Sequence, residues 1–274
     1  MNPLNEYSFS IITVSYNNVC GLSHTIESVI GQTFDDYEFI IIDGDSSDGS
    51  KQIIEQNKRN FTYWCSEPDS GIYNAMNKGI MQAKGKYLIF MNAGDTFFSN
   101  KVLEQVFPQL DNIDIIVGYA LKNGKSYQNI HEEDVLMMLF HSSFSHQATF
   151  IKRDLFQNYR YDEKLEIVSD WKAWVDWIVI DNHTYKYIDT VVANYDFTGI
   201  SSDCKNWNRI LLERESVLKS SFPPLVLKKL RECHDIYLRG HIKYLRKHPI
   251  LSFLCISWIK AMASIGKFLS LFEK

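Results

Sequence analysis

The chain has 274 residues, of which 45% are hydrophobic, and its formal net charge is −4. This length and hydrophobic content suit one large globular domain or a domain with an appendage. The negative charge argues against nucleic acid as a partner, and the five scattered cysteines lack metal-ligand spacing. The first residues also lack the basic and apolar regions of a cleaved signal peptide. We therefore expect a cytoplasmic globular protein with reduced cysteines.

The first hundred residues alternate apolar runs with amphipathic segments. Short runs rich in β-branched and aromatic residues, such as residues 9–15, are typical of buried strands. Apolar residues at helical spacing after Asn18, and again after Ser47 or Asp48, indicate helices that begin near a capping side chain. The predicted strands are residues 9–15, 39–42, 63–65 and 86–91, and the predicted helices are residues 19–30, 48–54 and 72–83. This alternation predicts an α/β protein with a mostly parallel sheet and helices on both faces.

The rest of the chain continues this pattern as far as residue 224. Strands are predicted at residues 113–119, 147–151 and 185–195, and helices at 134–140 and 170–180. Beyond Pro224 the pattern changes to large apolar residues at helical spacing among basic side chains. Residues 225–274 contain 10 Lys and Arg but only 3 Asp and Glu. We predict a main domain over residues 1–224 and a basic amphipathic helical tail over residues 225–274.

Acidic residues follow two of the predicted parallel strands. Asp43 and Asp45 come after the second strand, and Asp95 comes after the fourth. Because ligands bind at the carboxyl edge of open α/β sheets, these carboxylates suit a divalent cation that in turn binds a diphosphate. Asp, Ser and Gly also form turns and helix caps, so each acid has a structural alternative. Their repetition at strand ends favours a binding site.

Five segments resemble, in order and spacing, the family 2 glycosyltransferases of the GT-A fold. They are residues 10–17, 28–34, 41–50, 66–79 and 85–95. The resemblance extends over about residues 9–200 and is greatest to bacterial members that build surface polysaccharides. It implies that residues 1–224 form a Rossmann-like GT-A catalytic domain. Its nucleotide-binding half would be about residues 1–100 and its acceptor-binding half about residues 101–224.

The resemblance also implies which residues border the nucleotide. Tyr16 would stack on the base, and Asp43 would accept a hydrogen bond from it, which for uracil comes from N3. The full set is Thr13, Ser15, Tyr16, Asp43, Asp69, Asn77 and Lys78. Taken singly, Tyr16 has the alternative of a core aromatic, and Lys78 that of a solvated helix residue.

Asp95 aligns with the last acid of the family's metal motif, so the resemblance implies that it binds Mn²⁺ or Mg²⁺. Many relatives have two adjacent acids here, whereas this chain has Gly94 before Asp95. One carboxylate together with a diphosphate can still hold a cation that keeps several waters. We therefore expect a metal-dependent enzyme with an incomplete form of the usual motif.

Asp170 is the candidate general base. Glycosyl transfer needs a group that removes the proton of the acceptor hydroxyl, and a carboxylate within hydrogen-bond reach does this. The family places its catalytic acid at the start of a helix in this region, and Ser169-Asp170-Trp171 resembles that arrangement. The structural alternative is an acid that interacts favourably with the helix dipole.

Two further residues are candidates for contact with the acceptor or the diphosphate. His146 precedes a predicted strand, as a histidine often does in the family, although a lone histidine is commonly a structural group. Trp171 could line an acceptor groove together with Trp174 and Trp177. Three tryptophans at helical spacing are equally typical of a packed core.

The tail has two interpretations. Its basic amphipathic part and the apolar residues 250–258 suit a helix that lies on an anionic membrane surface, while Lys260 disfavours a membrane-spanning helix. The alternative is a helical subdomain that packs on the main domain or on a second copy in a homodimer. Attachment to the inner membrane also suits the acceptor that the resemblance implies, a saccharide carried on a polyprenyl diphosphate.

The sequence thus predicts an inverting glycosyltransferase. A nucleotide-diphosphate sugar, with UDP as the expected nucleotide, would donate to a hydroxyl of a lipid-linked saccharide in polysaccharide synthesis. A nucleotidyltransferase is a competing interpretation, but the Gly-rich phosphate loop expected after the first strand is replaced by Tyr16-Asn-Asn18. A non-catalytic membrane-associated protein that keeps the nucleotide pocket is the second alternative.

Overall fold

The computed structural model describes residues 7–122, 125–126, 135–197 and 199–247. The chain divides into two compact units, Met1–Ser221 and Phe222–Lys274. The described part of the second unit consists mainly of helix α8, Pro224–Lys247. The apolar run and the lysines that we assigned to a membrane surface, from residue 250 onward, lie outside the described residues. None of the helices within the described ranges is both long enough and apolar enough to cross a membrane.

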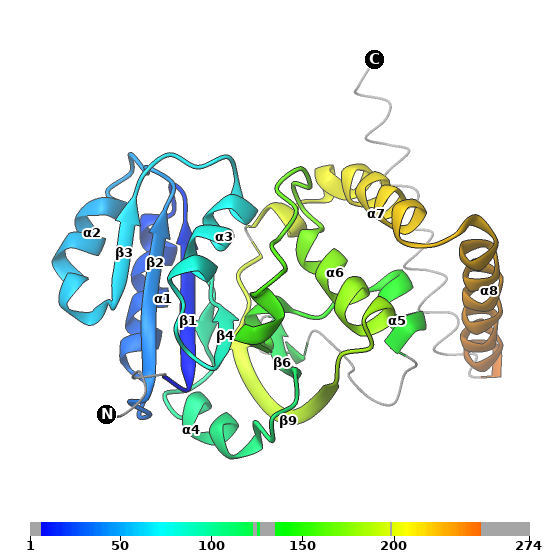
Figure 1. Cartoon of the computed structure of the whole chain (residues 1–274), viewed down its shortest axis with the longest axis horizontal. Helices are drawn as coiled ribbons and strands as arrows, with labels where there is room; N and C mark the ends of the chain where they lie inside the picture. Colours follow the sequence, from blue (N-terminus) through cyan, green and yellow to red (C-terminus); the bar gives the residue numbers. More distant parts are fainter. Residues whose placement is uncertain (1–6, 123–124, 127–134, 198, 248–274) are drawn as a thin grey trace. The chain divides into compact units, whose positions relative to one another are not determined.

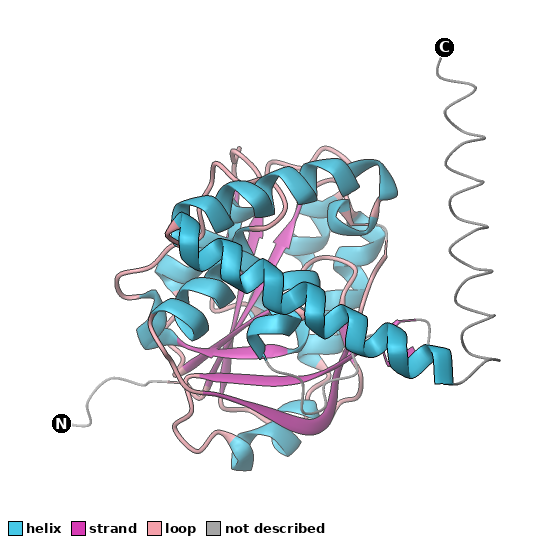
Figure 2. Ribbon diagram, turned by 90° about the vertical axis from the view of Figure 1, so that its right-hand side faces the viewer, coloured by secondary structure: helices cyan, strands magenta, loops and turns pink. Residues whose placement is uncertain are grey.

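The first unit contains one curled α/β sheet with flanking helices (Figures 1 and 2). In the described residues the strand order is β3-β2-β1-β4-β8-β6-β9-β5, and β7 pairs with β6. The strands are β1 Phe9–Ser15, β2 Tyr37–Asp43, β3 Tyr63–Ser66, β4 Tyr87–Phe90, β5 Thr96–Phe97, β6 Ile115–Lys122, β7 Lys125–Ser126, β8 Thr149–Lys152 and β9 Tyr185–Asn194. The helices are α1 Val19–Ile30, α2 Ser50–Asn57, α3 Ile72–Gln82, α4 Val102–Val106, α5 Val135–His141, α6 Ser169–Trp174 and α7 Trp207–Ser221.

The N-terminal half of the sheet is parallel, as predicted. Strands β1, β2, β3 and β4 pair in parallel, and every residue of β1 is buried because helices cover both faces. Alternate residues face opposite ways: Ile11 packs in one core cluster with α1, whereas Gly79 of α3 approaches Ile12 on the other face. A Cβ on Gly79 would lie only 2.5 Å from the Cγ2 of Ile12, so α3 can come this close only at a glycine.

The C-terminal half of the sheet is mixed and brings late segments back to the first half. Strands β4 and β8 pair antiparallel, as do β6 and β8, whereas β6 and β9 are parallel. The two-residue strand β5 pairs antiparallel with the end of β9, with Thr96 opposite Asn194. This pairing places the residues just before β5 beside those just after β9. The sequence did not predict β5, α4 or α7, and the helix predicted over residues 170–180 is α6 followed by a π-helical segment, Val175–Ile180.

Candidate active site

A cavity of about 930 Å³ lies at the carboxyl edge of the parallel strands, and we call it the sheet-edge cavity. The loops after β1, β2 and β4 line it, together with the segment after β9. Its principal polar lining residues are Ser15, Tyr16, Asn17, Asn18, Asp45, Asp69, Asn92, Asp95, His146, Tyr195, Asp196 and Ser201. This location agrees with the general position of ligand sites in open α/β sheets.

Three of the residues predicted to border the nucleotide line this cavity: Ser15, Tyr16 and Asp69. Tyr16 is 67% exposed, so it is not a core aromatic. A Cβ on Gly44 would lie 3.2 Å from the Cδ2 of Tyr16 and 3.2 Å from the Cγ of Asp69. The absence of a side chain at Gly44 thus lets Tyr16 and Asp69 approach each other across the cavity wall.

The other four predicted residues do not line the sheet-edge cavity. Thr13 is fully buried and donates to the carbonyl of Met91 at 2.7 Å. Asn77 holds α3 to the chain at Tyr161, whose N–H donates to Oδ1 of Asn77 at 3.0 Å. The ammonium of Lys78 donates to the carbonyl of Pro68 at 3.0 Å and forms an ion pair with Glu67 at 2.8 Å.

The fourth, Asp43, is fully buried at the end of β2 and orders the turn that follows. The amide and hydroxyl of Ser46 donate to its two carboxylate oxygens at 3.0 and 2.5 Å, and the hydroxyl of Ser66 donates at 2.7 Å. Between Asp43 and Ser46 lie Gly44 and Asp45, both of which line the cavity, and Asp45 has a positive φ of 63°. Asp43 therefore fixes the backbone of the loop that carries these two residues.

Asp95 is the most buried acid of the sheet-edge cavity, with 4% exposure. Burial raises its pKa to about 7, although the positive charge of His146 and the N–H of Asp196 act in the opposite direction. The N–H of Asp196 donates to Oδ1 of Asp95 at 2.9 Å. A buried carboxylate with so little compensation suits a bound cation.

The donor set at Asp95 is small but fits a hard divalent cation. Asp95 and Asp196 both line the cavity, and oxygen atoms are the ligands that Mg²⁺ and Mn²⁺ prefer. Among the described residues there is no group of three or more His, Cys, Asp and Glu side chains placed to hold a metal. A cation here would therefore need further oxygen ligands from a diphosphate and water.

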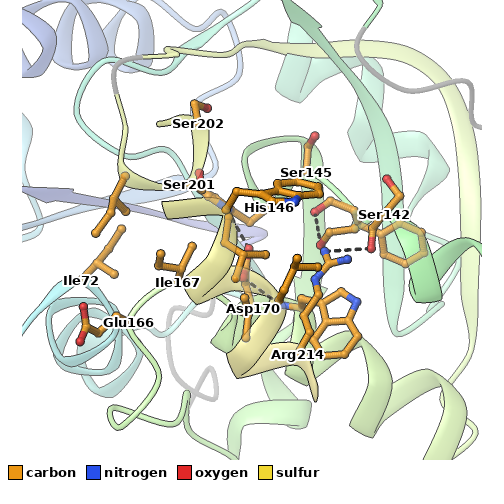
Figure 3. Close-up of a pocket in the computed structure, with 18 of the residues that line it drawn as sticks. Ile72, Ser142, Ser145, His146, Glu166, Ile167, Asp170, Ser201, Ser202 and Arg214 are labelled. Atoms are coloured by element: carbon orange, nitrogen blue, oxygen red, sulfur yellow. Dashed lines mark hydrogen bonds and ion pairs between the residues drawn. The ribbon is translucent and has the colours of Figure 1, made fainter. Parts of the chain in front are cut away.

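A second cavity, of about 770 Å³, adjoins the first, and we call it the α7 cavity (Figure 3). Its polar lining includes His146, Asp170 and Arg214, and apolar side chains of α7 such as Trp207 and Leu211 form another part of the wall. Five residues line both cavities: Ile72, His146, Tyr195, Ile200 and Ser201. The two cavities therefore meet at His146.

Asp170 lies in the first turn of α6, in contact with three polar groups. Nδ1 of His146 is 3.3 Å from Oδ2 of Asp170, and the hydroxyl of Tyr73 donates to Oδ1 at 3.0 Å. The backbone N–H of Trp171 also donates to Oδ1, at 2.8 Å. The side chains of Asp170 and His146 are each 17% exposed, so the pair is largely shielded from solvent.

These contacts lower the pKa of Asp170 and raise the pKa of His146, and both shifts favour the charged forms. Burial by itself would raise the pKa of Asp170, but the hydrogen bond and charge of His146, together with the bonds from Trp171 and Tyr73, lower that pKa below its usual value. Burial would likewise lower the pKa of His146, but Asp170, with a smaller contribution from Asp95, raises it above 6.5. At neutral pH Asp170 is ionised, which is the state that can accept a proton.

The three tryptophans near Asp170 divide between cavity and core. Trp171 lines the α7 cavity, donates to the carbonyl of Leu139 at 2.8 Å, and has the guanidinium of Arg214 4.8 Å from its ring centroid. Trp174 and Trp177 are 0% and 1% exposed and do not line that cavity. The acceptor-groove interpretation thus remains open for Trp171 only.

Sequence reasoning missed the contribution of the segment after β9. Tyr195, Asp196 and Ser201 all line the sheet-edge cavity. The signal was present, because Asp196 follows a predicted strand just as Asp43 and Asp95 do. Asn92 was also missed, although it belongs to the turn that ends with Asp95.

Solved structures share this fold. A mannosyltransferase from Pyrobaculum calidifontis, determined with GDP-Man and Mn²⁺, has a TM-score of 0.61 at 13% identity over 85% of this chain and 70% of its own. S. aureus TarS residues 1–349 with UDP has a TM-score of 0.57 at 17% identity, covering 69% of this chain and 60% of that one. This chain matches 36% of the longer TarS chain. The fold is that of the GT-A glycosyltransferases, as predicted.

Sequence comparison gives the family. The model of glycosyl transferase family 2 matches residues 10–166, which is more than half of the chain. A PGL/p-HBAD biosynthesis glycosyltransferase of Mycobacterium bovis is 27% identical over 202 residues, 71% of this chain and 79% of the relative. A glycosyltransferase of Rickettsia typhi is 28% identical over 256 residues, 86% of this chain and 77% of the relative. The chain belongs to glycosyl transferase family 2, and it is a glycosyltransferase enzyme.

Proposed function

We propose that the enzyme is an inverting glycosyltransferase that uses a nucleotide-diphosphate sugar, with UDP as the nucleotide, and a hydroxyl group of a lipid-linked saccharide. The observation that carries the proposal is Asp170, an ionised carboxylate in the wall of the α7 cavity, held by His146 where that cavity meets the sheet-edge cavity. Two cavities that meet at the histidine beside a base suit a donor on one side and an acceptor on the other.

The sheet-edge cavity is the proposed donor site. Tyr16 has an exposed ring that can stack on the base, and Ser15 and Asp69 line the same cavity. Asp43 is proposed to support this site by ordering the loop that carries Gly44 and Asp45, and its direct contact with the base stays a prediction. TarS binds UDP and UDP-GlcNAc, and the archaeal mannosyltransferase binds GDP-Man, which supports a nucleotide-sugar donor.

Asn77, Lys78 and Thr13 do not line this cavity, and we propose that they hold in place the segments that do. Lys78 holds Pro68, which lines the cavity next to Asp69, and Asn77 anchors α3. Removing any of these three would therefore loosen the wall that the nucleotide contacts. Their direct contact with ribose or diphosphate stays a prediction.

In the proposed reaction Asp170 accepts the proton of the acceptor hydroxyl. The acceptor oxygen then forms a bond to the anomeric carbon while the bond from that carbon to the diphosphate breaks, and the nucleoside diphosphate leaves with the electron pair. A single displacement of this kind inverts the anomeric configuration. Mn²⁺ or Mg²⁺ bound at Asp95 would stabilise the negative charge on the departing diphosphate. His146 orients Asp170 through the contact of its Nδ1 with Oδ2.

A panel of nucleotides tests the donor proposal. Because a ligand stabilises the native state by mass action, UDP with Mn²⁺ is expected to raise the thermal unfolding temperature more than GDP, ADP or CMP does. Tyr16→Ala should remove most of this shift without lowering the unfolding temperature of the free protein, since the ring is exposed. A panel in which no nucleotide shifts unfolding, or in which UDP-sugars are never hydrolysed or transferred, would contradict the proposal.

The lipid-linked acceptor is proposed from the apolar edge of the α7 cavity. Trp207, Leu211 and Ile200 line this cavity with exposed fractions of 61%, 49% and 45%. An exposed apolar rim beside a polar base suits an acceptor that has both a sugar and a hydrocarbon part.

We also propose that the tail attaches the enzyme to the cytoplasmic face of the inner membrane. The excess of Lys and Arg in residues 225–274 supports binding to anionic lipid. Full-length protein is expected to co-sediment with vesicles of anionic phospholipid and not with zwitterionic ones, and deletion of residues 225–274 should abolish this binding. Unchanged binding after the deletion would contradict the membrane role and leave packing on the catalytic domain or a homodimer as the alternatives.

A further inference from the structure

The side-chain space of Gly94 is occupied by a residue from a distant part of the chain. Gly94 has a φ of 109°, a conformation that residues with a Cβ rarely adopt. A Cβ built on Gly94 would lie 2.9 Å from the Cγ and 3.0 Å from the Cβ of Asp196. No side chain fits at position 94 while Asp196 is in place, and a carboxylate lies where many relatives have their first acid.

A strand pairing and a hydrogen bond hold Asp196 at this position. Antiparallel pairing of β5 and β9 brings the chain after Asn194 alongside the chain before Thr96. The N–H of Asp196 then donates to Oδ1 of Asp95 at 2.9 Å, although the two residues are 101 positions apart. Both acids line the sheet-edge cavity.

A polar atom in the wall of the sheet-edge cavity lacks a partner and so indicates a ligand. Ser15 is 5% exposed, and its hydroxyl has no hydrogen-bond partner in the part of the chain that the structure describes. Ser15 lines the same cavity as Asp95 and Asp196. Buried polar groups are nearly always hydrogen-bonded or ligated, so a polar ligand with its own water or phosphate oxygens accounts for this hydroxyl.

We propose that Asp196 supplies the second carboxylate of the divalent-cation site and so replaces the acid that is missing at Gly94. Two carboxylates form one side of an oxygen shell, and the donor diphosphate and water complete it. The inference rests on the proposed function for the source of the diphosphate. It goes beyond that function by assigning a ligand from the chain after β9, outside the short motif that ends in Asp95.

Manganese binding tests this assignment without any measurement of transfer. The full-length protein is titrated with Mn²⁺, in the absence and presence of UDP, and the loss of the free-ion EPR signal reports binding. Asp196→Asn is expected to weaken Mn²⁺ binding about 10- to 100-fold, a range typical for loss of a group in or next to a metal's coordination shell. Asp95→Asn should weaken it at least as much. Asp35→Asn, which removes an exposed carboxylate that lines neither cavity, should leave the affinity within about twofold of the parent.

The control separates ligation from a general loss of negative charge. If Asp35→Asn weakens binding as much as Asp196→Asn does, or if Asp196→Asn binds Mn²⁺ like the parent, the assignment is overturned. It is also overturned if the parent binds no Mn²⁺ with or without UDP. Thermal unfolding in EDTA should be similar for all variants, because asparagine has nearly the size of aspartate. Absence of sugar transfer together with the expected pattern of Mn²⁺ affinities would contradict the proposed function but not this inference.

Discussion

Replacing Asp170 with asparagine is expected to lower kcat for sugar transfer about 10²- to 10⁴-fold, the usual contribution of a general base. Asparagine has nearly the same shape, and its amide oxygen can still accept the N–H of Trp171 and the hydroxyl of Tyr73. The substitution therefore removes proton acceptance with little change in the wall of the α7 cavity. Initial rates with a competent acceptor measure kcat and KM separately, and KM for the donor should change little.

Asp176 provides a matched control on the π-helical segment that continues α6. Its carboxylate pairs with Lys172 at 2.6 Å and accepts from the hydroxyl of Tyr159 at 3.0 Å, and it does not line the α7 cavity. Asp176→Asn should keep kcat within a few-fold of the parent. If Asp170→Asn transferred sugar as fast as the parent to every competent acceptor, Asp170 could not be the base.

The same substitution should also be visible at His146, without any substrate. Loss of the Asp170 charge removes the main interaction that raises the pKa of His146, whereas burial continues to lower it. The pKa of His146, followed by NMR, is therefore expected to fall in Asp170→Asn and to stay unchanged in Asp176→Asn. A group that only filled space beside the histidine would not produce this difference.

Trp174→Ala is expected to lower the free energy of unfolding by about 3–5 kcal/mol, the range for truncating a fully buried aromatic side chain. Trp174 is 0% exposed and packs against Phe144 and Trp177, with ring centroids 5.7 and 5.6 Å away. Removing the indole leaves a large cavity under α6, because the neighbouring rings cannot close it completely. Urea unfolding followed by circular dichroism measures the change.

Trp207 is the control for Trp174 because it is 61% exposed. Its replacement by alanine should change the free energy of unfolding by about 0.5 kcal/mol or less, as is usual for surface positions. Equal losses for the two variants would contradict the division of these tryptophans between core and surface. Because Trp207 lines the α7 cavity, Trp207→Ala should instead raise KM for an acceptor with a hydrocarbon part.

Local patterns were sufficient for the elements that fill the core. Residues 9–15 and 39–42 became β1 and β2 because short runs of β-branched and aromatic residues favour a strand that is buried on both faces. The prediction failed for β5 and α7. Strand β5 has only two residues, which is too short to show a periodic pattern. Helix α7 has several large apolar residues that are exposed beside a cavity, so its hydrophobic pattern differs from that of a helix that faces the core.

The sequence predicted the position of candidate site residues only where these residues follow the ends of parallel strands. Asp95 and Asp69 line the sheet-edge cavity as expected, because all parallel strands end at one edge. Asp43 follows the same rule, yet the structure buries it under Ser46 and Ser66, and no residue-type pattern distinguishes the two outcomes. The roles of Thr13, Asn77 and Lys78 depended in the same way on which neighbours the fold supplies.

The sequence by itself determined the α/β class, the family, the alternation of strands and helices in the first hundred residues and the acids at the strand ends, because each of these depends on residues close together in the chain. Only the tertiary structure decided which distant groups contact Asp170, at the start of α6, and Asp95, at a strand end. Tyr73 reaches Asp170 across 97 residues, His146 reaches it across 24, and Asp196 reaches Asp95 across 101. The packing of α3 near α6 brings Tyr73 to Asp170, and the pairing of β5 with β9 brings Asp196 to Asp95. Neither arrangement leaves a periodic pattern in the sequence. The charge state of Asp170 depends on such contacts, as does the cation site that we propose.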